Sequence, residues 1–426
     1  MQNILIFPSG TEIAFEIFNA LKDQKYYTIY GGTSADDHSK FVYKNLIIDI
    51  PFVTDKNFIN KINEIIANYN IDYIYPAHDI AIEVFANIED QINAKIVTSP
   101  KSTVLTLRSK LLTYEHLSKY SFIPKYYNNV NEIHEFPVFI KPQKGQGAQG
   151  TKKINTVEEL EHELQSSSNL IICEYLGGTE YTVDCFTDKN GTLQTTIMRE
   201  RARIKTGISV RANSLHTPKE VEDIAHIINS EFTFNGAWFF QLKLNSSGKY
   251  KLLEISPRIP GTMGCTRMKG INYPLLTLYN MQGYDVKISP NTYEVQLDRA
   301  FISRHKININ YDTIYVDLDD TLIIKDQINY SLLTLLYQNK SKERKNILIS
   351  RHAKNIKETL NKFAISENLF SEIIHILSDK KKSSYIKDQN SIFIDDSFRE
   401  RIDVQQNCKI NVFDVDMIES LLDWRK

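Results

Sequence analysis

The sequence predicts a multidomain protein built from α/β and α+β units, and three observations support this prediction. Hydrophobic residues make up 42% of the 426 residues and charged residues 24%, which is typical of globular chains with packed cores. Apolar runs typical of strands alternate with helical patterns near both ends of the chain. Apolar runs separated by turn residues occupy the middle of the chain. Because a domain averages roughly 150 residues, we expect about three domains.

Charge and composition exclude several classes of protein. Lys and Arg number 51 against 52 Asp and Glu, a balance unlike that of a basic nucleic-acid-binding protein. No apolar run approaches the roughly 18 residues of a membrane span, and the N-terminus lacks the basic region of a signal peptide. Four scattered cysteines without a CxxC pattern indicate reduced thiols and a cytoplasmic location. We therefore expect small-molecule partners, with no nucleic acid and no membrane, and leave open whether the protein is a homodimer.

Residues 1–100 are expected to form a small doubly wound α/β unit. The strands are expected at 3–7, 27–30, 46–50 and 71–75, and the helices at 13–21 and 58–69. This alternation has the spacing of βαβ units.

Residues 101–300 have an α+β pattern, and residues 310–426 return to α/β. In the middle region we expect a helix around Lys110 and strands at 137–142, 170–175, 181–187, 193–198, 238–245 and 249–255. In the last region we expect parallel strands at 313–318, 346–350, 391–394 and 409–413 with helices between them.

Lysines and glycines in the middle region suggest a phosphate site. Lys141 ends an apolar strand, where its charge is costly unless an anion, either a phosphate or a structural carboxylate, neutralises it. Gly145, Gly147 and Gly150 follow and would let backbone N–H groups approach phosphate oxygens, although a mobile turn is the alternative. Lys110 is either a second phosphate ligand or a solvated lysine.

Carboxylates in the middle region add to this set. Glu174 and Glu180 flank a strand–turn–strand segment, and Glu254 ends a later strand of a hairpin whose partner carries Gln241. Carboxylate and amide oxygens suit Mg²⁺. A single carboxylate carries little weight, whereas the ordered set of two lysines, a glycine loop, Glu-x(5)-Glu and Glu-x-x-Pro-Arg is specific.

This set resembles the ATP-grasp superfamily, especially the branch similar to the carbamoyl-phosphate synthase large subunit and biotin-carboxylase-like ligases. The resemblance covers about residues 1–290, and the N-terminal unit is similar to a pre-ATP-grasp domain. It implies that Lys110 and Lys141 bind the α- and β-phosphates of ATP and that Gly145–Gly150 closes over them. It further implies that Glu174, Tyr175 and Leu176 read adenine and that Glu180 binds the ribose hydroxyls.

The resemblance also implies a magnesium site and a reaction. Gln241 and Glu254 would hold Mg²⁺, or Mn²⁺ in its place, and Arg258 would stabilise the transferred phosphoryl group or the acyl-phosphate. Ser256 stands where the family usually has Asn, so a second ion would be completed by water or held loosely. The implied reaction activates a carboxylate as an acyl-phosphate, which an amine or thiol then attacks.

A basic cluster lies between the two hairpins of the middle region. Its members are Arg199, Arg201, Arg203 and Lys205, with Arg211 a further candidate. Because arginine forks match carboxylates and phosphates, the cluster could line a substrate site. The alternative is an exposed strand edge protected by charge.

A second set of motifs begins at Asp317 and Asp319, which directly follow a buried strand. Two carboxylates at this spacing suit a nucleophile and an acid/base group, although a helix cap or acidic turn is the alternative. A strand ending at Ser350, the triplet Lys380–Lys382 and a strand ending at Asp395 and Asp396 follow in order.

That order resembles the haloacid dehalogenase superfamily over about residues 310–426. The resemblance makes Asp317 the nucleophile, Asp319 the acid/base, Ser350 a phosphoryl ligand and Lys382, or else Lys381, a charge partner. Asp395 and Asp396 would bind Mg²⁺ with Asp317, and Asp319 is a further candidate ligand. The short segments between these motifs predict a capless Rossmann-like domain with an open site.

Together, the two resemblances predict an enzyme in which an ATP-dependent carboxylate–amine or –thiol ligase is fused to a phosphatase domain. Its expected domains are residues 1–100, 101–300 and 310–426. The alternatives are a small-molecule kinase that stops at a phosphorylated product, and a regulatory ATP-binding protein in which Ser256 marks weakened catalysis.

Overall fold

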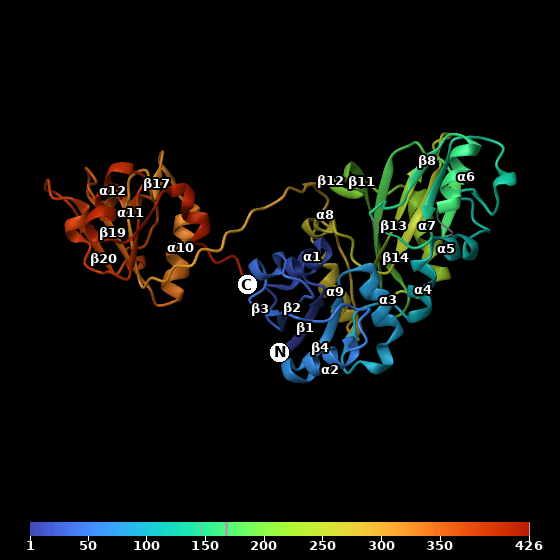
Figure 1. The fold of residues 1–426 in the computed structure, drawn as a ribbon, viewed down its shortest axis with the longest axis horizontal. Helices are drawn as coiled ribbons and strands as arrows, with labels where there is room; N and C mark the ends of the chain where they lie inside the picture. The colour runs from blue at the N-terminus through green and yellow to red at the C-terminus, as the bar shows by residue number, and fades with distance from the viewer. Residues whose placement is uncertain (146, 167–168, 426) are drawn as a thin grey trace. The chain divides into compact units, whose positions relative to one another are not determined.

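The computed structural model describes residues 1–145, 147–166 and 169–425 and contains two compact units (Figure 1). The first is Met1–Ala300 and the second is Phe301–Arg425. Residues 299–311 between them have no helix or strand. The first unit therefore spans the ranges 1–100 and 101–300 together.

The first unit begins with a five-stranded parallel sheet in the order β3-β2-β1-β4-β5. Its strands are β1 (Gln2–Phe7), β2 (Tyr27–Gly32), β3 (Asn45–Ile47), β4 (Ile71–Pro76) and β5 (Lys95–Ile96), and its helices are α1 (Glu12–Leu21), α2 (Phe58–Tyr69) and α3 (Asp79–Asn87). The expected helix at 58–69 is present with the same bounds. Strand order reverses between β1 and β4, and the loops after these two strands flank the crevice where such sheets bind ligands.

Two antiparallel sheets complete the first unit. The larger has the order β14-β13-β10-β11-β12-β15 and the smaller β6-β9-β7-β8. The larger sheet contains β10 (Glu180–Thr187), β11 (Leu193–Lys205), β12 (Ile208–Ser214), β13 (Gly236–Leu244), β14 (Tyr250–Ser256) and β15 (Gln296–Asp298). The smaller contains β6 (Tyr126–Tyr127), β7 (Val138–Pro142), β8 (Lys152–Ile154) and β9 (Leu170–Glu174). The helices of this region are α4 (Lys101–Arg108), α5 (Lys110–His116), α6 (Val157–Ser166), α7 (Lys219–Glu231), α8 (Gly264–Met268) and α9 (Tyr273–Met281).

Strand β11 is longer than expected and lies inside its sheet. It pairs with β10 on one side and β12 on the other, so the alternative of an exposed strand edge for Arg199–Lys205 is wrong. Its register with β12 shifts between Glu200 and Ile204. Such a bulge changes which face successive side chains occupy.

A second bulge lies between β13 and β14. Gln241 faces Glu254 and Leu242 faces Leu252, so Leu253 has no partner in the ladder. Leu252 is fully buried in the core, whereas Glu254 lies opposite a polar residue. The bulge thus places Glu254 and Leu252 on opposite faces of the sheet, although the two residues are two positions apart.

The second unit is a five-stranded parallel sheet in the order β20-β19-β16-β21-β22. Its strands are β16 (Thr313–Val316), β19 (Lys345–Ser350), β20 (Glu372–His375), β21 (Ser391–Ile394) and β22 (Asn411–Phe413), and its helices are α10 (Tyr330–Ser341), α11 (Ile356–Lys362) and α12 (Phe398–Cys408). The hairpin of β17 (Ile323–Ile324) and β18 (Gln327–Ile328) and the edge strand β20 were not expected from the sequence.

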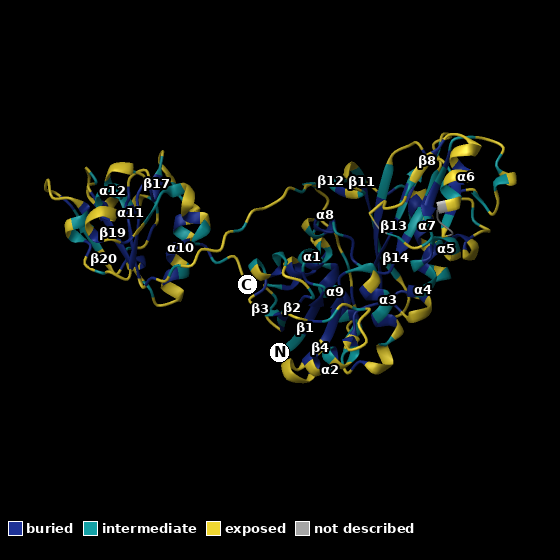
Figure 2. Cartoon of the chain, in the orientation of Figure 1, coloured by how far each residue is buried: buried dark blue, intermediate teal, exposed yellow. Residues whose placement is uncertain are grey.

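The central strands of the sheets are buried, and the helices expose their outer faces (Figure 2). In the second unit β16 and β21 are buried over their whole length, because helices cover both faces of that sheet. Within the part of the chain that the structure describes, no helix has the length and apolar character needed to cross a membrane.

Candidate functional site

A cleft of about 970 Å³ lies in the first unit, and it is lined by the two antiparallel sheets and by the loops and helices that follow β1 and β4 of the parallel sheet. The predicted residues on its wall are Lys110, Lys141, Gly145, Gly147, Glu174, Tyr175, Leu176, Glu180, Arg199, Arg201, Gln241, Glu254, Ser256 and Arg258. Gly150, Arg203, Lys205 and Arg211 are not among the lining residues. Residues from distant parts of the sequence thus meet at one cavity.

Lys141 is buried at the end of β7. Its Nζ donates to the Tyr114 hydroxyl at 2.5 Å and to the Leu253 carbonyl at 3.3 Å, and it lies 4.9 Å from the centre of the Tyr114 ring. Burial lowers the pKa of Lys141, and the nearby charge of Lys110 acts in the same direction. A cation that has lost its water without gaining a carboxylate partner is prepared to bind an anion from the cleft.

The Leu253 carbonyl is available because of the bulge in β14. Tyr114 donates its hydroxyl to this carbonyl at 2.8 Å and to that of Leu252 at 3.1 Å. The bulge therefore supplies a carbonyl that accepts a hydrogen bond from the Tyr114 hydroxyl, and this hydroxyl in turn accepts one from Lys141.

The residues around Glu254 suit a magnesium ion held largely by phosphate oxygens. Glu254 faces Gln241 across the β13–β14 ladder, and Ser256 lies two residues further on the same face. Lys110, the first residue of α5, places its Nζ 3.8 Å from the Glu254 carboxylate. One carboxylate, one amide and one hydroxyl match the few protein ligands that Mg²⁺ takes at nucleotide sites.

Glu180 is shared between two cations. Its carboxylate lies 2.9 Å from Arg201 and 3.7 Å from Lys243. Glu174 accepts a hydrogen bond from the backbone N–H of Lys125 at 2.8 Å, which holds the start of the predicted adenine segment. Tyr175 is exposed, with the Lys153 ammonium 4.6 Å from its ring centre.

Gly147 and Ala148 of the predicted glycine loop lie against the tip of the β11–β12 hairpin, and Gln146 lies outside the described residues. Gly147 and Gly150 have positive φ values of 58° and 68°, and a Cβ at Gly207 would lie 2.0 Å from the Gly147 carbonyl oxygen. The Gly145 carbonyl accepts hydrogen bonds from Lys110 and Arg108, both at 3.4 Å. Only glycine at position 207 allows this approach.

The bulge in β11 separates the members of the basic cluster. Arg201 lines the cleft, and beyond the bulge Ile204 and Thr206 take over that face. Arg203 and Arg211 pair instead with Asp298 of β15, at 2.9 and 2.7 Å. Lys205 is exposed at the end of β11, and Arg199 is buried on Asp184.

Sequence reasoning missed Asp79, which pairs with Arg258. Arg258 donates from Nε and Nη2 to the two carboxylate oxygens of Asp79, at 2.6 and 2.8 Å. Burial by itself would raise the pKa of Asp79, but the charge and hydrogen bonds of Arg258 lower it. The sequence signal that could have identified Asp79 is its position just after a strand of the parallel sheet, at the crevice where such sheets bind ligands.

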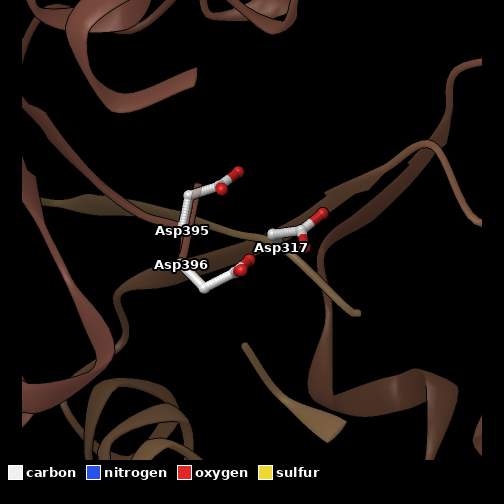
Figure 3. A group of neighbouring side chains, drawn as sticks. All are labelled: Asp317, Asp395 and Asp396. Carbon is white, nitrogen blue, oxygen red and sulfur yellow. The ribbon is translucent and has the colours of Figure 1, made fainter. Parts of the chain in front are cut away.

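In the second unit the carboxylates of Asp317, Asp395 and Asp396 converge at the ends of β16 and β21 (Figure 3). Their oxygen atoms lie within 4.8 Å of one another, a spacing that could hold a metal ion. Strand order reverses between β16 and β21, so these residues sit where open α/β sheets bind ligands. Ser397 caps α12 immediately after Asp396 and fixes this turn.

Lys382 lies between two of these carboxylates. Its Nζ is 2.6 Å from both Asp317 and Asp395, whereas Lys381 is exposed and pairs with Asp403 at 2.7 Å. Burial raises the pKa of Asp395 to about 6, with a further contribution from Asp317. Burial also raises the pKa of Asp317, against the opposing effects of Lys382 and a hydrogen bond from Ser350.

Asp319 is not a member of the group of three converging carboxylates and pairs with His352 instead. Its carboxylate oxygens lie 2.8 and 3.0 Å from Nδ1 of His352, whose Nε2 is 2.7 Å from the Thr359 hydroxyl. His352 follows Ser350 by two residues and was not singled out from the sequence.

A nucleotide-sized cleft between two antiparallel sheets, with lysines on one wall and a Gln–Glu pair on another, defines the ATP-grasp class of fold. Residues 166–300 match the family model described as "ATP-grasp in the biosynthetic pathway with Ter operon". A search of curated proteins found no match.

Solved structures support this assignment of the fold. The biotin carboxylase domain of Hydrogenobacter thermophilus 2-oxoglutarate carboxylase, solved with MgADP and bicarbonate, matches at 16% identity, 68% of this chain, 71% of that chain and a TM-score of 0.56. The Bacillus licheniformis L-amino acid ligase matches at 16% identity, 66% and 74% coverage and a TM-score of 0.53. Thermotoga maritima N5-carboxyaminoimidazole ribonucleotide synthetase matches at 14% identity, 73% and 83% coverage and a TM-score of 0.55. The first unit therefore has an ATP-grasp fold, as its motifs predict.

Proposed function

We propose that the first unit is an ATP-dependent ligase that joins a carboxylate to an amine or thiol through an acyl-phosphate. The observation that carries this proposal is the meeting of Lys110, Lys141, Glu254 and Arg258 in one cleft. Two ammonium groups and a guanidinium can neutralise phosphate charge, which is the main task of a phosphoryl-transfer site.

Each group has a defined part in the proposed reaction. The substrate carboxylate would attack the γ-phosphorus of ATP, and Lys110 and Lys141 would hold the phosphates in place during the transfer. Mg²⁺, or Mn²⁺, held by Gln241 and Glu254 with Ser256 nearby, would offset negative charge on the phosphate oxygens. Arg258 would bind the acyl-phosphate until the amine or thiol attacks its carbonyl carbon.

The structural neighbours favour a ligase over a kinase. A synthetase, an amino acid ligase and a carboxylase share the fold at identities of 14–16%. The apolar end of the cleft, with Leu107, Phe139 and Leu176, suits adenine, and Glu180 suits the ribose hydroxyls. Arg201 remains a proposed substrate ligand. To bind substrate, Arg203 and Arg211 would have to leave Asp298, and Lys205 would have to turn toward the cleft.

For the second unit we propose a magnesium-dependent phosphohydrolase of the haloacid dehalogenase kind, spanning residues 310–426. The bridge from Lys382 to Asp317 and Asp395 supports this proposal, because it holds a nucleophilic carboxylate beside a metal-binding pair. Asp317 would take up the phosphoryl group and Asp319 would protonate the leaving group. Ser350 would bind the phosphoryl oxygens, and Asp396 would complete the metal site.

Release of ADP from ATP, measured with panels of acids and amines, tests the ligase proposal. A ligase requires one compound from each panel, a kinase requires one acceptor, and a regulatory ATP-binding protein releases no ADP above background. The same preparation, assayed with an aryl phosphate and Mg²⁺, tests the phosphohydrolase. Light scattering of the purified chain decides between a monomer and the homodimer that a cytoplasmic enzyme of this class could form.

A further inference from the structure

Arg258 is held from three directions before any substrate binds. Nε and Nη2 donate to the two oxygens of Asp79 at 2.6 and 2.8 Å, and Nη1 donates to the Ile259 carbonyl at 3.1 Å. The guanidinium carbon also lies 5.1 Å from the centre of the Phe239 ring on β13. These contacts leave the guanidinium plane little freedom to rotate.

Two N–H donors of Arg258 remain for a ligand. A guanidinium has five N–H groups, and among the described residues these contacts engage one on each nitrogen. Because Asp79 takes the Nε/Nη2 edge, the free N–H of Nη2 lies on the end edge of the group, and Nη1 keeps one of its two N–H groups for a further partner. Such a pair matches two oxygens of a phosphoryl group or carboxylate.

Asp79 comes from a different sheet than Arg258. It is the first residue of α3, directly after β4 of the parallel sheet, whereas Arg258 follows β14 of the large antiparallel sheet. Both side chains are 14% exposed and line the cleft. The ion pair therefore connects two walls of the cleft, next to the place where the proposed function puts the transferred phosphoryl group.

We propose that Asp79 is a positioning residue that directs the free end of Arg258 toward the transferred phosphoryl group. Its carboxylate occupies the Nε/Nη2 edge of the guanidinium, so that the free donors on Nη1 and Nη2 remain for a ligand in the cleft. This role rests on the proposed ligase function of the first unit. It assigns the N-terminal α/β region a part in phosphoryl binding through a residue that does not touch the phosphoryl group itself.

A competing role for Asp79 makes the opposite prediction. If its carboxylate instead occupied the place of the substrate anion, Arg258 would have to release Asp79 before binding. Removing the charge of Asp79 would then strengthen anion binding, whereas removing a positioning residue weakens it.

Calorimetric titration of orthophosphate into the MgADP-saturated full chain distinguishes the two roles. We expect Asp79→Asn to bind MgADP with wild-type affinity and orthophosphate about tenfold more weakly, because a misdirected arginine loses its bidentate contact. Asp36→Asn is the matched control: it removes a surface carboxylate of the same α/β region that pairs with Lys40. It should leave both affinities unchanged.

A double-mutant cycle with Arg258→Lys tests whether Asp79 acts through Arg258. In the Arg258→Lys background, Asp79→Asn should produce no further loss of phosphate affinity, whereas an independent structural effect would add to it. If Asp79→Asn fails to bind MgADP, Asp79→Glu replaces it, because this variant keeps the charge and displaces the carboxylate.

Equal or tighter phosphate binding in the Asp79 variant that binds MgADP, or no measurable phosphate binding to either protein, would overturn the proposal. Failure of the wild-type chain to bind MgADP would instead refute the proposed function.

Discussion

Replacing Lys141 with methionine should stabilise the nucleotide-free protein while weakening nucleotide binding. Methionine keeps the length of the side chain and removes a cation that burial has stripped of water. The polar neighbours of Lys141 stay satisfied, because Tyr114 donates to the Leu252 and Leu253 carbonyls without it. Exchanging a buried charge for an apolar group of similar size is often neutral or stabilising by about 1–4 kcal/mol.

We therefore expect the first unit to gain about 1–2 kcal/mol, or about 2–4 °C in Tm at roughly 2 °C per kcal/mol for a unit of this size. The pKa of Lys141 lies below its ordinary value of 10.5, so the folded protein binds this proton less tightly than the unfolded chain. Wild-type stability consequently falls as pH falls through the folded pKa. The advantage of the variant should be complete below the folded pKa of Lys141 and should shrink as pH rises toward 10.5.

Nucleotide binding should change in the opposite direction. A hydrogen bond to a charged group contributes about 1.5–3 kcal/mol, so the Kd for MgADP should rise roughly tenfold to a hundredfold. At a concentration of 100 times the wild-type Kd, MgADP stabilises the wild type by about 2.7 kcal/mol. A variant with a thirtyfold higher Kd would gain only about 0.9 kcal/mol at that concentration.

Thermal unfolding of the full chain, with and without MgADP, measures both effects, since the transition that MgADP shifts belongs to the first unit. Lys119→Met removes an exposed lysine that pairs with Glu231 and serves as the control, with no change expected in MgADP affinity. A nucleotide-free variant less stable than the wild type, or an unchanged Kd for MgADP, would refute the reasoning.

Four further substitutions probe the two sites. Glu254→Ala should abolish ADP formation and leave ADP binding measurable by calorimetry, and wild-type turnover would remove the metal assignment. Ser256→Asn should preserve or raise magnesium-dependent activity, and a large loss would give the serine a role of its own. Asp317→Asn should eliminate aryl phosphatase activity while ADP release persists, and mass spectrometry should find any phosphorylated compound that then accumulates. Lys382→Met should destabilise the second unit by about 3–5 kcal/mol in urea unfolding at pH 8, because it leaves Asp317 and Asp395 buried without their cation. In metal-free buffer this loss should shrink below pH 6, near the pKa of Asp395, and an unchanged loss would contradict that account.

The sequence predicts the position of a residue well where its neighbours in the sequence determine its surroundings. Lys141 follows the apolar residues Val138–Ile140, and Glu254 and Asp395 each come at the end of an apolar strand, so the strand pattern places all three at strand ends. The structure places Lys141 and Glu254 at the cleft and Asp395 at the second carboxylate group.

Features that depend on strand register or on partners far away in the sequence could not be predicted. The sequence presents Arg201 and Arg203 as one cluster, but the bulge in β11 turns only the first of them to the cleft. Asp79 pairs with a residue 179 positions away, and its own surroundings show only a carboxylate after a strand. Strand β20 is short and only half buried, and thus lacks the apolar run by which the other strands were recognised.

The unpaired Leu253 of β14 has a consequence for how this strand can change in evolution. What position 253 supplies to Tyr114 and Lys141 is a backbone carbonyl, which most amino acids could provide, so exchanges of residue type there should be tolerated. Removing one residue from the strand is a different event, because it would restore the regular ladder and, while leaving Glu254 opposite Gln241, would take away the unpaired carbonyl that holds Tyr114 and Lys141. Among related chains, the length of this strand should therefore separate those that hold Tyr114 and Lys141 in this way from those that keep the fold alone.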